Sequence, residues 1–435
     1  MTFGNFSAIL SCQCHKTMCD TIVALPPFTA QNNLIFAKNS DREPNEAHAL
    51  LHLPRKQHMA STLQCTYIKV PQVQESCEVI LSKPFQMWGA EMGINEYGVV
   101  IGNEAVFTRA KIKKINSGLT GMDQLRIALE RSKTAREAIS QITALLEKFG
   151  QDACGGYENK AFFYHNSFII ADPEEAYILE TAGKSWALKK IMEAGSISNG
   201  LQIGSDYDEI HLAEEKLYFP FNLFPKPQPF SFREHYSDFL YTKVGSAKKR
   251  QNCSYGLLQK DKGRLTVEKA MAILKTHEAP DPDFNPKKAS TESLCMHATG
   301  LTNPSTTTGS MVAEIRKNKP STVWLTGTSM PCLSVFIPFF IGTKTLTDFA
   351  QPGASPDSSL WWKAELLHRW IGEDYQVRKR DFQNDLQALQ QSFLKQEASL
   401  ISIGANLSEL EIFSNECLLK VMQFYKKCAK NINLL

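Results

Sequence analysis

The chain has 435 residues, 43% apolar and 21% charged, a composition that excludes disordered, collagen-like and fibrous proteins. Lys and Arg number 48 against 45 Asp and Glu, and this balance gives no reason to expect a nucleic-acid or anionic-membrane partner. No stretch reaches the roughly 20 apolar residues that span a bilayer, which argues against membrane insertion. The eleven cysteines are odd in number and irregularly spaced, a usage typical of reduced thiols, so we predict a cytoplasmic protein.

Short β-prone runs fill the first part of the chain. CDTIVALPP (19–27) and NNLIFAKNS (32–40) predict two strands joined by a turn rich in proline and asparagine. CEVILSKP (77–84) and YGVVIGNEAV (97–106) predict further strands, and Gly98 would supply the positive φ of a hairpin turn. Apolar residues then recur at helical spacing over 120–149, with a break at 132–134 that predicts two helices, the second capped by Thr134.

The second part of the chain predicts more strands and then a helical end. SFIIAD, EAYILETAG and KSWALKKI (167–191) predict a strand meander, and strands return between 310 and 340. We expect 346–359 to be a linker and 360–435 to be helical, with Trp362, Leu366 and Trp370 on one stripe. Strands, helices and strands in this order predict two sheets with helices packed outside them, an α+β fold.

Met18-Cys19 is the most informative dipeptide for chemistry. If translation begins at Met18, or if the chain is cleaved after it, Cys19 becomes the amino-terminal residue. Its α-amine, with an ordinary pKa of about 7.7–8.0, could then act as base for its own thiol. Taken alone, one cysteine among eleven is more often buried and inert.

Two polar clusters could complete a site around Cys19. The first runs from Lys38 through Asn39 and Asp41 to Arg42 and suits an electropositive pocket for a thiolate or a substrate carboxylate. A polar turn after a strand is the alternative. The second runs from Trp88 to 105 and would deliver Asn103 at the end of a strand, where its amide could donate to an oxyanion. Here the alternative is a plain polar strand end.

Other chemistries have weaker support. Cys12, Cys14 and His15 precede Cys19, but they lack a second Cys/His pair nearby, so we predict no metal site. His165 and His297 could each pair with a thiol as in papain-like proteases, yet no local signature of that class surrounds any cysteine. His297 could still line the substrate pocket. Phosphate-loop and dinucleotide-binding motifs are missing, so we expect no cofactor.

Several of these segments together resemble a known family. Cys19-Asp20-Thr21, the run from Asn39 to Arg42 and WGAEMGINEYGVVIGNEA (88–105) resemble the secernins and the dipeptidases of family C69, which are similar to bile-salt hydrolases and penicillin V acylases. The resemblance implies an N-terminal-nucleophile hydrolase with a four-layer αββα sandwich and a C-terminal helical tail. It makes 19–345 the hydrolase domain and 1–18 an extension that is removed or lies upstream of the true start.

The resemblance also implies roles for particular residues. Cys19 would be the nucleophile, Asp41 would hold its amine or thiol, and Asn103 and Asn199 would stabilise the oxyanion. Lys38 stands where the acylases have an arginine beside the thiol. The residues expected to contact substrate are Lys38, Asn39, Arg42, Trp88 and His297.

The implied activity is that of a cysteine-type dipeptidase or related amide hydrolase that acts on short peptides without a metal or cofactor. A homo-oligomer is compatible with this resemblance. The alternative is a catalytically silent, secernin-like protein that acts in secretion through protein interactions. The two differ in whether Cys19 reacts with an electrophile and whether the mature chain begins there.

Overall fold

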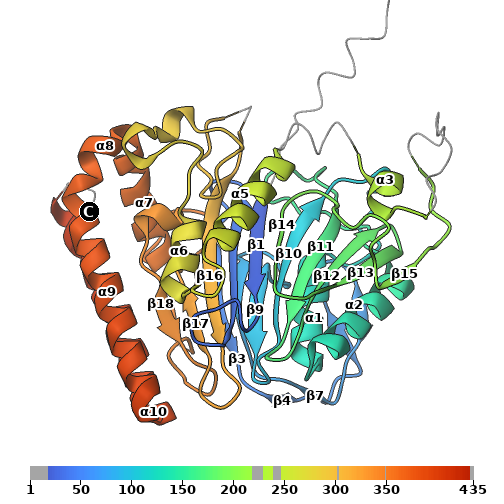
Figure 1. Cartoon of the computed structure of the whole chain (residues 1–435), viewed down its shortest axis with the longest axis horizontal. Coiled ribbons are helices and arrows are strands. Elements are labelled where there is room, and N and C mark those ends of the chain that lie inside the picture. Colours follow the sequence, from blue (N-terminus) through green and yellow to red (C-terminus); the bar gives the residue numbers. More distant parts are fainter. Residues whose placement is uncertain (1–17, 218–228, 239–245, 301–302, 348, 432–435) are drawn as a thin grey trace, which may run out of the picture.

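The computed structural model describes residues 18–217, 229–238, 246–300, 303–347 and 349–431. Two large antiparallel sheets lie face to face, and helices cover the outer face of each (Figure 1). The four layers are therefore helix, sheet, sheet and helix. This arrangement confirms the predicted αββα sandwich.

The first sheet has six strands and carries the residue of most interest, Cys19, at the start of β1. Strand β1 contacts β10 and β11 of the other sheet, so this face of β1 lines the space between the sheets. In spatial order the strands are β14 (Ala194–Ile197), β1 (Cys19–Ala24), β2 (Leu34–Arg42), β16 (Thr306–Ile315), β17 (Thr322–Leu325) and β18 (Ile337–Phe339).

The second sheet has eight strands. Its spatial order is β15 (Glu209–His211), β13 (Ser185–Ile191), β12 (Ala176–Ala182), β11 (His165–Ala171), β10 (Val100–Val106), β9 (Met92–Asn95), β8 (Val79–Pro84) and β3 (His48–Leu53). Short strands pair apart from it: β4 (Lys56–Gln57) with β7 (Glu75–Ser76), and β5 (Thr62–Gln64) with β6 (Lys69–Pro71). Gly98, between β9 and β10, has φ +79°, which confirms the predicted turn.

The outer helices follow the capping signals in the sequence. Helices α1 (Gly121–Arg131) and α2 (Ala135–Phe149) pack on β9 to β12, and the Thr134 side chain caps α2 as predicted. Helices α5 (Ala247–Lys260) and α6 (Val267–Leu274) cover β14, β1, β2 and β16. Shorter elements are α3 (Phe232–Tyr236), η1 (Asp281–Asp283), η2 (Pro286–Lys288) and η3 (Pro331–Leu333).

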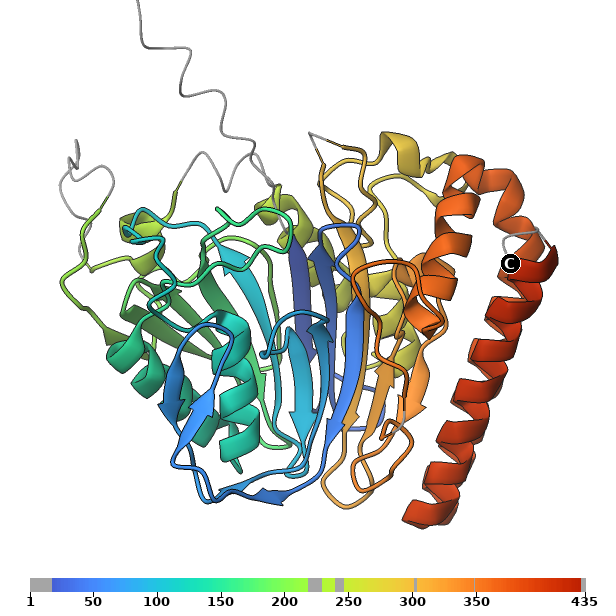
Figure 2. The ribbon, with the colours of Figure 1, turned by 180° about the vertical axis from the view of Figure 1, so that it is seen from behind.

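The C-terminal region is helical, as predicted. It contains α7 (Leu360–Glu373), α8 (Tyr375–Arg378), α9 (Arg380–Ile403) and α10 (Leu407–Asn431). Helix α10 packs on α7 and on β18, beside the edge of the six-stranded sheet (Figure 2). Its apolar side chains join the same core as those of β16 and β17.

The structure adds detail to two expectations about the last third of the chain. Trp362 is buried, but Leu366 and Trp370 are half-buried; the inward stripe of α7 runs instead through Trp361, Leu367 and Ile371. The Trp361 indole donates to the Thr308 carbonyl near the start of β16. This bond sets the rotation of α7. The last of the strands expected between 310 and 340 is short, Ile337–Phe339, because η3 turns the chain just before it.

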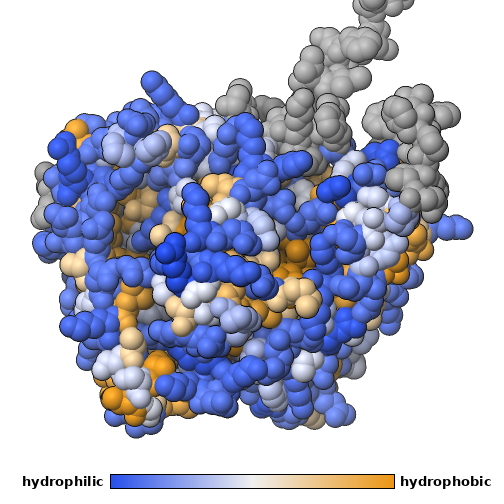
Figure 3. All heavy atoms as spheres, in the orientation of Figure 1, coloured by the Kyte–Doolittle hydropathy of each residue, from blue (hydrophilic) through white to orange (hydrophobic). Residues whose placement is uncertain are grey.

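The face seen in Figure 3 is mainly hydrophilic, with small apolar patches between charged side chains. Among the described helices, none combines the length and the apolar character that crossing a bilayer requires.

Candidate active site

Cys19 opens β1 opposite Ser40 of β2, and both its nitrogen and its sulfur have polar neighbours. The backbone N–H of Cys19 donates to Oδ1 of Asn199, two residues past the end of β14, at 2.8 Å. The backbone N–H of Asp41 points at Sγ from 3.3 Å. With Met18 still attached the Cys19 side chain is only 3% exposed, and Met18 itself is buried. The thiol thus lies buried at the end of a strand pair.

The amide of Asn199 is fixed from two sides. Its Nδ2 donates to the carbonyl of Ala105 at 2.9 Å, and its Oδ1 accepts a second bond, 2.5 Å long, from the guanidinium of Arg250. Arg250 lies on α5 and is fully buried; its Nε donates to Asp20 at 3.0 Å and Nη2 donates to Ser198 at 2.9 Å. Asn199 therefore presents an oxygen, and not an N–H, to the nitrogen of Cys19.

Lys38 and Glu104 form a buried ion pair between the two sheets. Lys38 Nζ lies 3.0 Å from Glu104 Oε1, and neither side chain is exposed. Gly102 makes room for this pair, because a Cβ there would come within 2.7 Å of the Lys38 Cδ. Thr21 also donates to Glu104. Burial raises the pKa of Glu104 to about 7, although the charge of Lys38 acts against the shift.

These charges act on the thiol. Burial raises the pKa of the Cys19 thiol well above its ordinary value; Lys38 acts to lower it, and Glu104 acts to raise it. Burial alone would lower the pKa of Lys38, but Cys19, when its thiol is ionised, and the carboxylate of Glu104 raise it. Lys38 is therefore a cation, and the thiol is neutral unless a base removes its proton.

Arg42, the last residue of β2, is held by two carboxylates. It bonds to Glu46 at 2.6 Å and to Glu91 at 3.1 Å, and all three side chains are buried. The second oxygen of Glu91 lies 4.0 Å from the Cys19 sulfur. Arg42 thereby fixes a carboxylate beside the thiol.

Asp41 contacts the thiol through its backbone, while its carboxyl group lies elsewhere. Oδ1 accepts a 2.6 Å bond from Thr307 of β16. Burial, with a contribution from the charge of Asp20, raises the pKa of Asp41 well above its ordinary value. Since side chains alternate along a strand, Arg42 faces the other sheet and Asp41 faces the outer layer.

The structure does not bring the remaining predicted residues to the thiol. Asn103 lies in the middle of β10, not at its end, and its Nδ2 donates to Asn166 at 3.2 Å. The amide of Asn39 donates to the carbonyls of Leu274 and Leu294 on the outer face of the six-stranded sheet. Trp88 stacks under Arg126 of α1, and His297 belongs to a different cluster, with two cysteines and a second histidine.

Sequence reasoning missed Glu91, Glu104 and Arg250. The two glutamates stand in the segment 88–105, and their position in β-prone runs was a usable signal, because charged residues within buried strands need partners. Arg250 lies in a segment of mixed character, and its partner Asp20 is 230 positions away, so no local pattern could connect them.

Comparison with known proteins finds a peptidase family whose sequence model matches part of the chain. Residues 38–215, which include every strand of the eight-stranded sheet, match the sequence model of peptidase family C69. The matched segment is less than half of the chain. Together with the curated relatives, the match supports a peptidase or a related amide hydrolase.

Curated relatives match over most of the chain. A protein named probable dipeptidase A from Streptococcus pyogenes serotype M18 (strain MGAS8232) is 22% identical over 359 residues, which cover 73% of this chain and 72% of that protein. The protein of the same name from serotype M3 (strain SSI-1) is 23% identical over 357 residues, 73% of each chain. Among solved structures, a mutant of the conjugated bile acid hydrolase from Clostridium perfringens aligns with 10% identity and a TM-score of 0.40, covering 70% of this chain and 88% of that one.

Proposed function

We propose that this chain is a cysteine-type dipeptidase of the C69 type, whose nucleophile is the Cys19 thiol and whose general base is the Cys19 α-amine. The observation that carries the proposal is the 2.8 Å bond between the Cys19 nitrogen and Asn199, which orients the nitrogen beside its own sulfur. The names of the curated relatives support a dipeptide as substrate.

The raised pKa of the thiol makes a base necessary. A buried thiol that stays neutral is a poor nucleophile, because the thiolate is the reactive form. Of the nine histidines that the structure describes, 165, 277, 297 and 368 bond to groups other than the Cys19 sulfur, and so do 48, 52 and 58. An α-amine on the same residue, with an ordinary pKa near 8, meets the need.

The proposal requires release of Met18. A peptide nitrogen shares its lone pair with the carbonyl and cannot accept a proton. Hydrolysis of the Met18–Cys19 bond, or initiation at Met18 followed by its removal, frees the amine. It also uncovers a thiol that is 3% exposed while Met18 remains.

The reaction then follows in two halves. The amine takes the thiol proton, Sγ attacks the carbonyl carbon of the substrate amide, and the carbonyl oxygen becomes an oxyanion. Collapse breaks the C–N bond, and the ammonium returns its proton to the leaving nitrogen. Water, deprotonated by the same amine, cleaves the thioester to give the carboxylic acid and the free thiol.

Asn199 is proposed to orient the amine, because its Oδ1 accepts from the Cys19 nitrogen at 2.8 Å. We also propose that the Glu91 oxygen that lies 4.0 Å from Sγ binds the ammonium group of a short peptide.

The test is hydrolysis of a dipeptide panel by purified protein that begins at Cys19. The Cys19→Ser variant should lose activity, and Cys65→Ser, which changes another buried thiol outside this site, should retain it. If the mature wild-type chain cleaves no dipeptide and Cys19 does not react with an electrophile, the catalytically silent, secernin-like alternative is favoured instead.

A further inference from the structure

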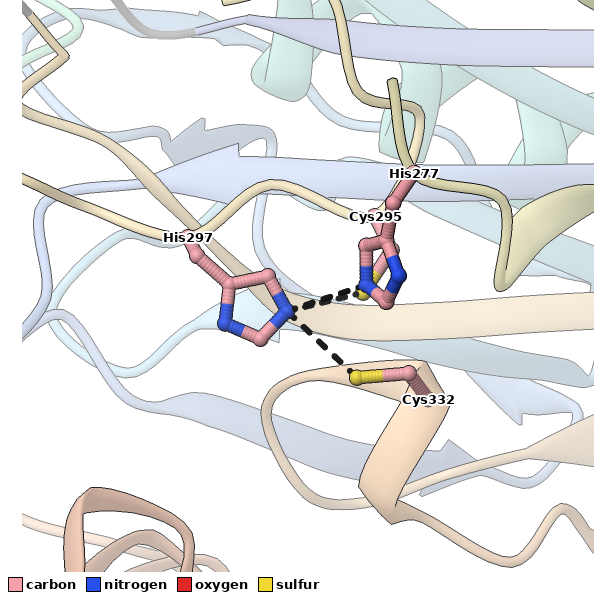
Figure 4. A group of neighbouring side chains, drawn as sticks. All are labelled: His277, Cys295, His297 and Cys332. Carbon is pink, nitrogen blue, oxygen red and sulfur yellow. Dashed lines mark hydrogen bonds between the residues drawn. The ribbon is translucent and has the colours of Figure 1, made fainter. Parts of the chain in front are cut away.

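Four potential metal ligands converge on the outer side of the six-stranded sheet (Figure 4). His277 follows α6, Cys295 and His297 lie in the segment that leads to β16, and Cys332 lies in η3. One nitrogen or sulfur atom from each residue lies within 4.8 Å of the other three. Segments separated by up to 55 positions thus direct two sulfurs and two imidazoles at one point.

The three distances from His297 Nε2 to the other ligand atoms are those of a tetrahedral zinc shell. The Nε2 atoms of His277 and His297 are 3.3 Å apart, and His297 Nε2 lies 3.5 Å from the sulfur of Cys295 and 3.4 Å from that of Cys332. Zn–N bonds of about 2.0–2.1 Å and Zn–S bonds of about 2.3 Å at tetrahedral angles require N···N of about 3.4 Å and N···S of about 3.5 Å. All three observed distances agree within about 0.2 Å, the tolerance for such a site.

We propose that His277, Cys295, His297 and Cys332 bind one zinc ion as a structural site. Two thiolates and two neutral imidazoles are a ligand set that zinc prefers, whereas magnesium and calcium require oxygen donors. Four protein ligands leave no open position for substrate, so the ion is structural and not catalytic.

Other uses of these side chains fit the geometry less well. In a cysteine–histidine catalytic pair one imidazole faces one thiol, but here His297 Nε2 faces two sulfurs and a second ring nitrogen at once. A disulfide between Cys295 and Cys332 would leave the two Nε2 atoms facing each other without a common ligand. A metal ion satisfies all four groups together.

The surroundings suit such a site. Tyr375 of α8 donates to the Cys332 sulfur at 3.5 Å, and Phe284 stacks on the His277 ring. A cavity of about 830 Å³ reaches His277 and Cys332, which gives the ion a path from solvent.

The zinc site would also position the predicted active site. Met296, between two of the ligands, donates its N–H to Thr307 at 2.9 Å, and Thr307 donates to Asp41 at 2.6 Å. Asp41 in turn directs its N–H at the Cys19 sulfur. An ion that fixes the segment around Met296 therefore holds Asp41 in place. Asp41 lies near the end of β2, and its backbone N–H contacts the Cys19 sulfur.

The first experiment measures metal in the full-length wild-type protein, purified without chelators from zinc-supplemented cells. We expect about one zinc per chain by mass spectrometry, and X-ray absorption with two sulfurs at about 2.3 Å and two nitrogens at about 2.0 Å. Zinc below about 0.1 per chain that does not rise on adding Zn²⁺ overturns the proposal, as does a shell of oxygens. An intact mass lower by the two hydrogens of a Cys295–Cys332 disulfide also overturns it.

Variants then assign the ligands. In the double variant Cys295→Ser/Cys332→Ser, the zinc content per chain should fall by more than about tenfold. The control Cys253→Ser/Cys428→Ser changes two cysteines outside the cluster and should keep its zinc. Retention of zinc by the first variant contradicts the assignment. Zinc in Cys19→Ser should stay at the wild-type level, so the result does not depend on the proposed catalysis.

Discussion

The backbone nitrogen of Cys19 lies 2.8 Å from Oδ1 of Asn199, although 180 positions separate the two residues. The contact exists because β14 pairs with β1 and delivers Asn199 beside the first residue of β1. Arg250 binds the same oxygen at 2.5 Å and keeps it in place. The nitrogen that we propose as the base is therefore oriented by a rigid partner before any substrate arrives.

Replacing Asn199 separates its two possible roles. Asn199→Asp keeps an oxygen that can accept from the amine but loses the Nδ2 donor, whereas Asn199→Leu loses both. If Asn199 orients the amine, kcat should fall by about 10²-fold in the leucine variant and clearly less in the aspartate variant. Equal losses in both would show instead that the N–H is needed at the oxyanion, as the family resemblance implies.

The Arg250–Asp20 pair should be important for stability. Arg250→Met leaves the Asp20 carboxylate buried without its partner, and we expect a loss of about 3–5 kcal/mol in the free energy of unfolding. Urea denaturation measures it. Arg264→Met, at a 69% exposed arginine paired with Asp261, should change stability by no more than about 1 kcal/mol. Adding Asp20→Asn to Arg250→Met should recover part of the loss; no recovery would mean that the charge of Asp20 is not the cause.

Lys38 and Glu104 should move the reactivity of Cys19 in opposite directions. The cation lowers the pKa of the thiol and the carboxylate raises it. In mature protein, the midpoint of the pH profile for alkylation of Cys19 should therefore rise in Lys38→Met and fall in Glu104→Gln. Peptide mass spectrometry of the alkylated residue gives both profiles. A shift in the same direction for the two variants would contradict the electrostatic account.

His165 should make the fold sensitive to acid. Burial lowers its pKa to about 3 in the folded chain, against about 6.5 when unfolded. Between these values the unfolded chain binds the extra proton, so stability is full above about pH 6.5 and falls by about 1.4 kcal/mol per pH unit as the pH drops toward 3. Urea denaturation at several pH values should show a slope shallower by this amount in His165→Gln. An unchanged slope would mean that His165 becomes protonated without unfolding.

Much of the fold could be predicted from local patterns. The strands around Cys19 and Phe168, the two helices divided before Thr134 and the turn at Gly98 all have short-range causes: alternation, helical spacing, a cap and a positive φ. The rotation of α7 could not be predicted, because the contact of Trp361 with β16 decides it.

The site was harder to predict for the same reason. Lys38 and Asn39 are neighbours on one strand, and side chains alternate along a strand. The sequence was therefore enough to predict that only one of the two faces the other sheet. In contrast, the contacts Arg250–Asp20 and His277–Cys332 join segments that only the tertiary fold brings together. The sequence led to the prediction that His297 lines the pocket, because two of its three partners, His277 and Cys332, are 20 and 35 positions away along the chain.

The most direct test of the account is the intact mass of purified, catalytically active protein, read together with its dipeptidase activity. We predict a chain that begins at Cys19, with activity appearing in step with the loss of residues 1–18. A chain that keeps Met18 attached and hydrolyses dipeptides at the full rate would contradict the account, since its Cys19 nitrogen could not act as a base.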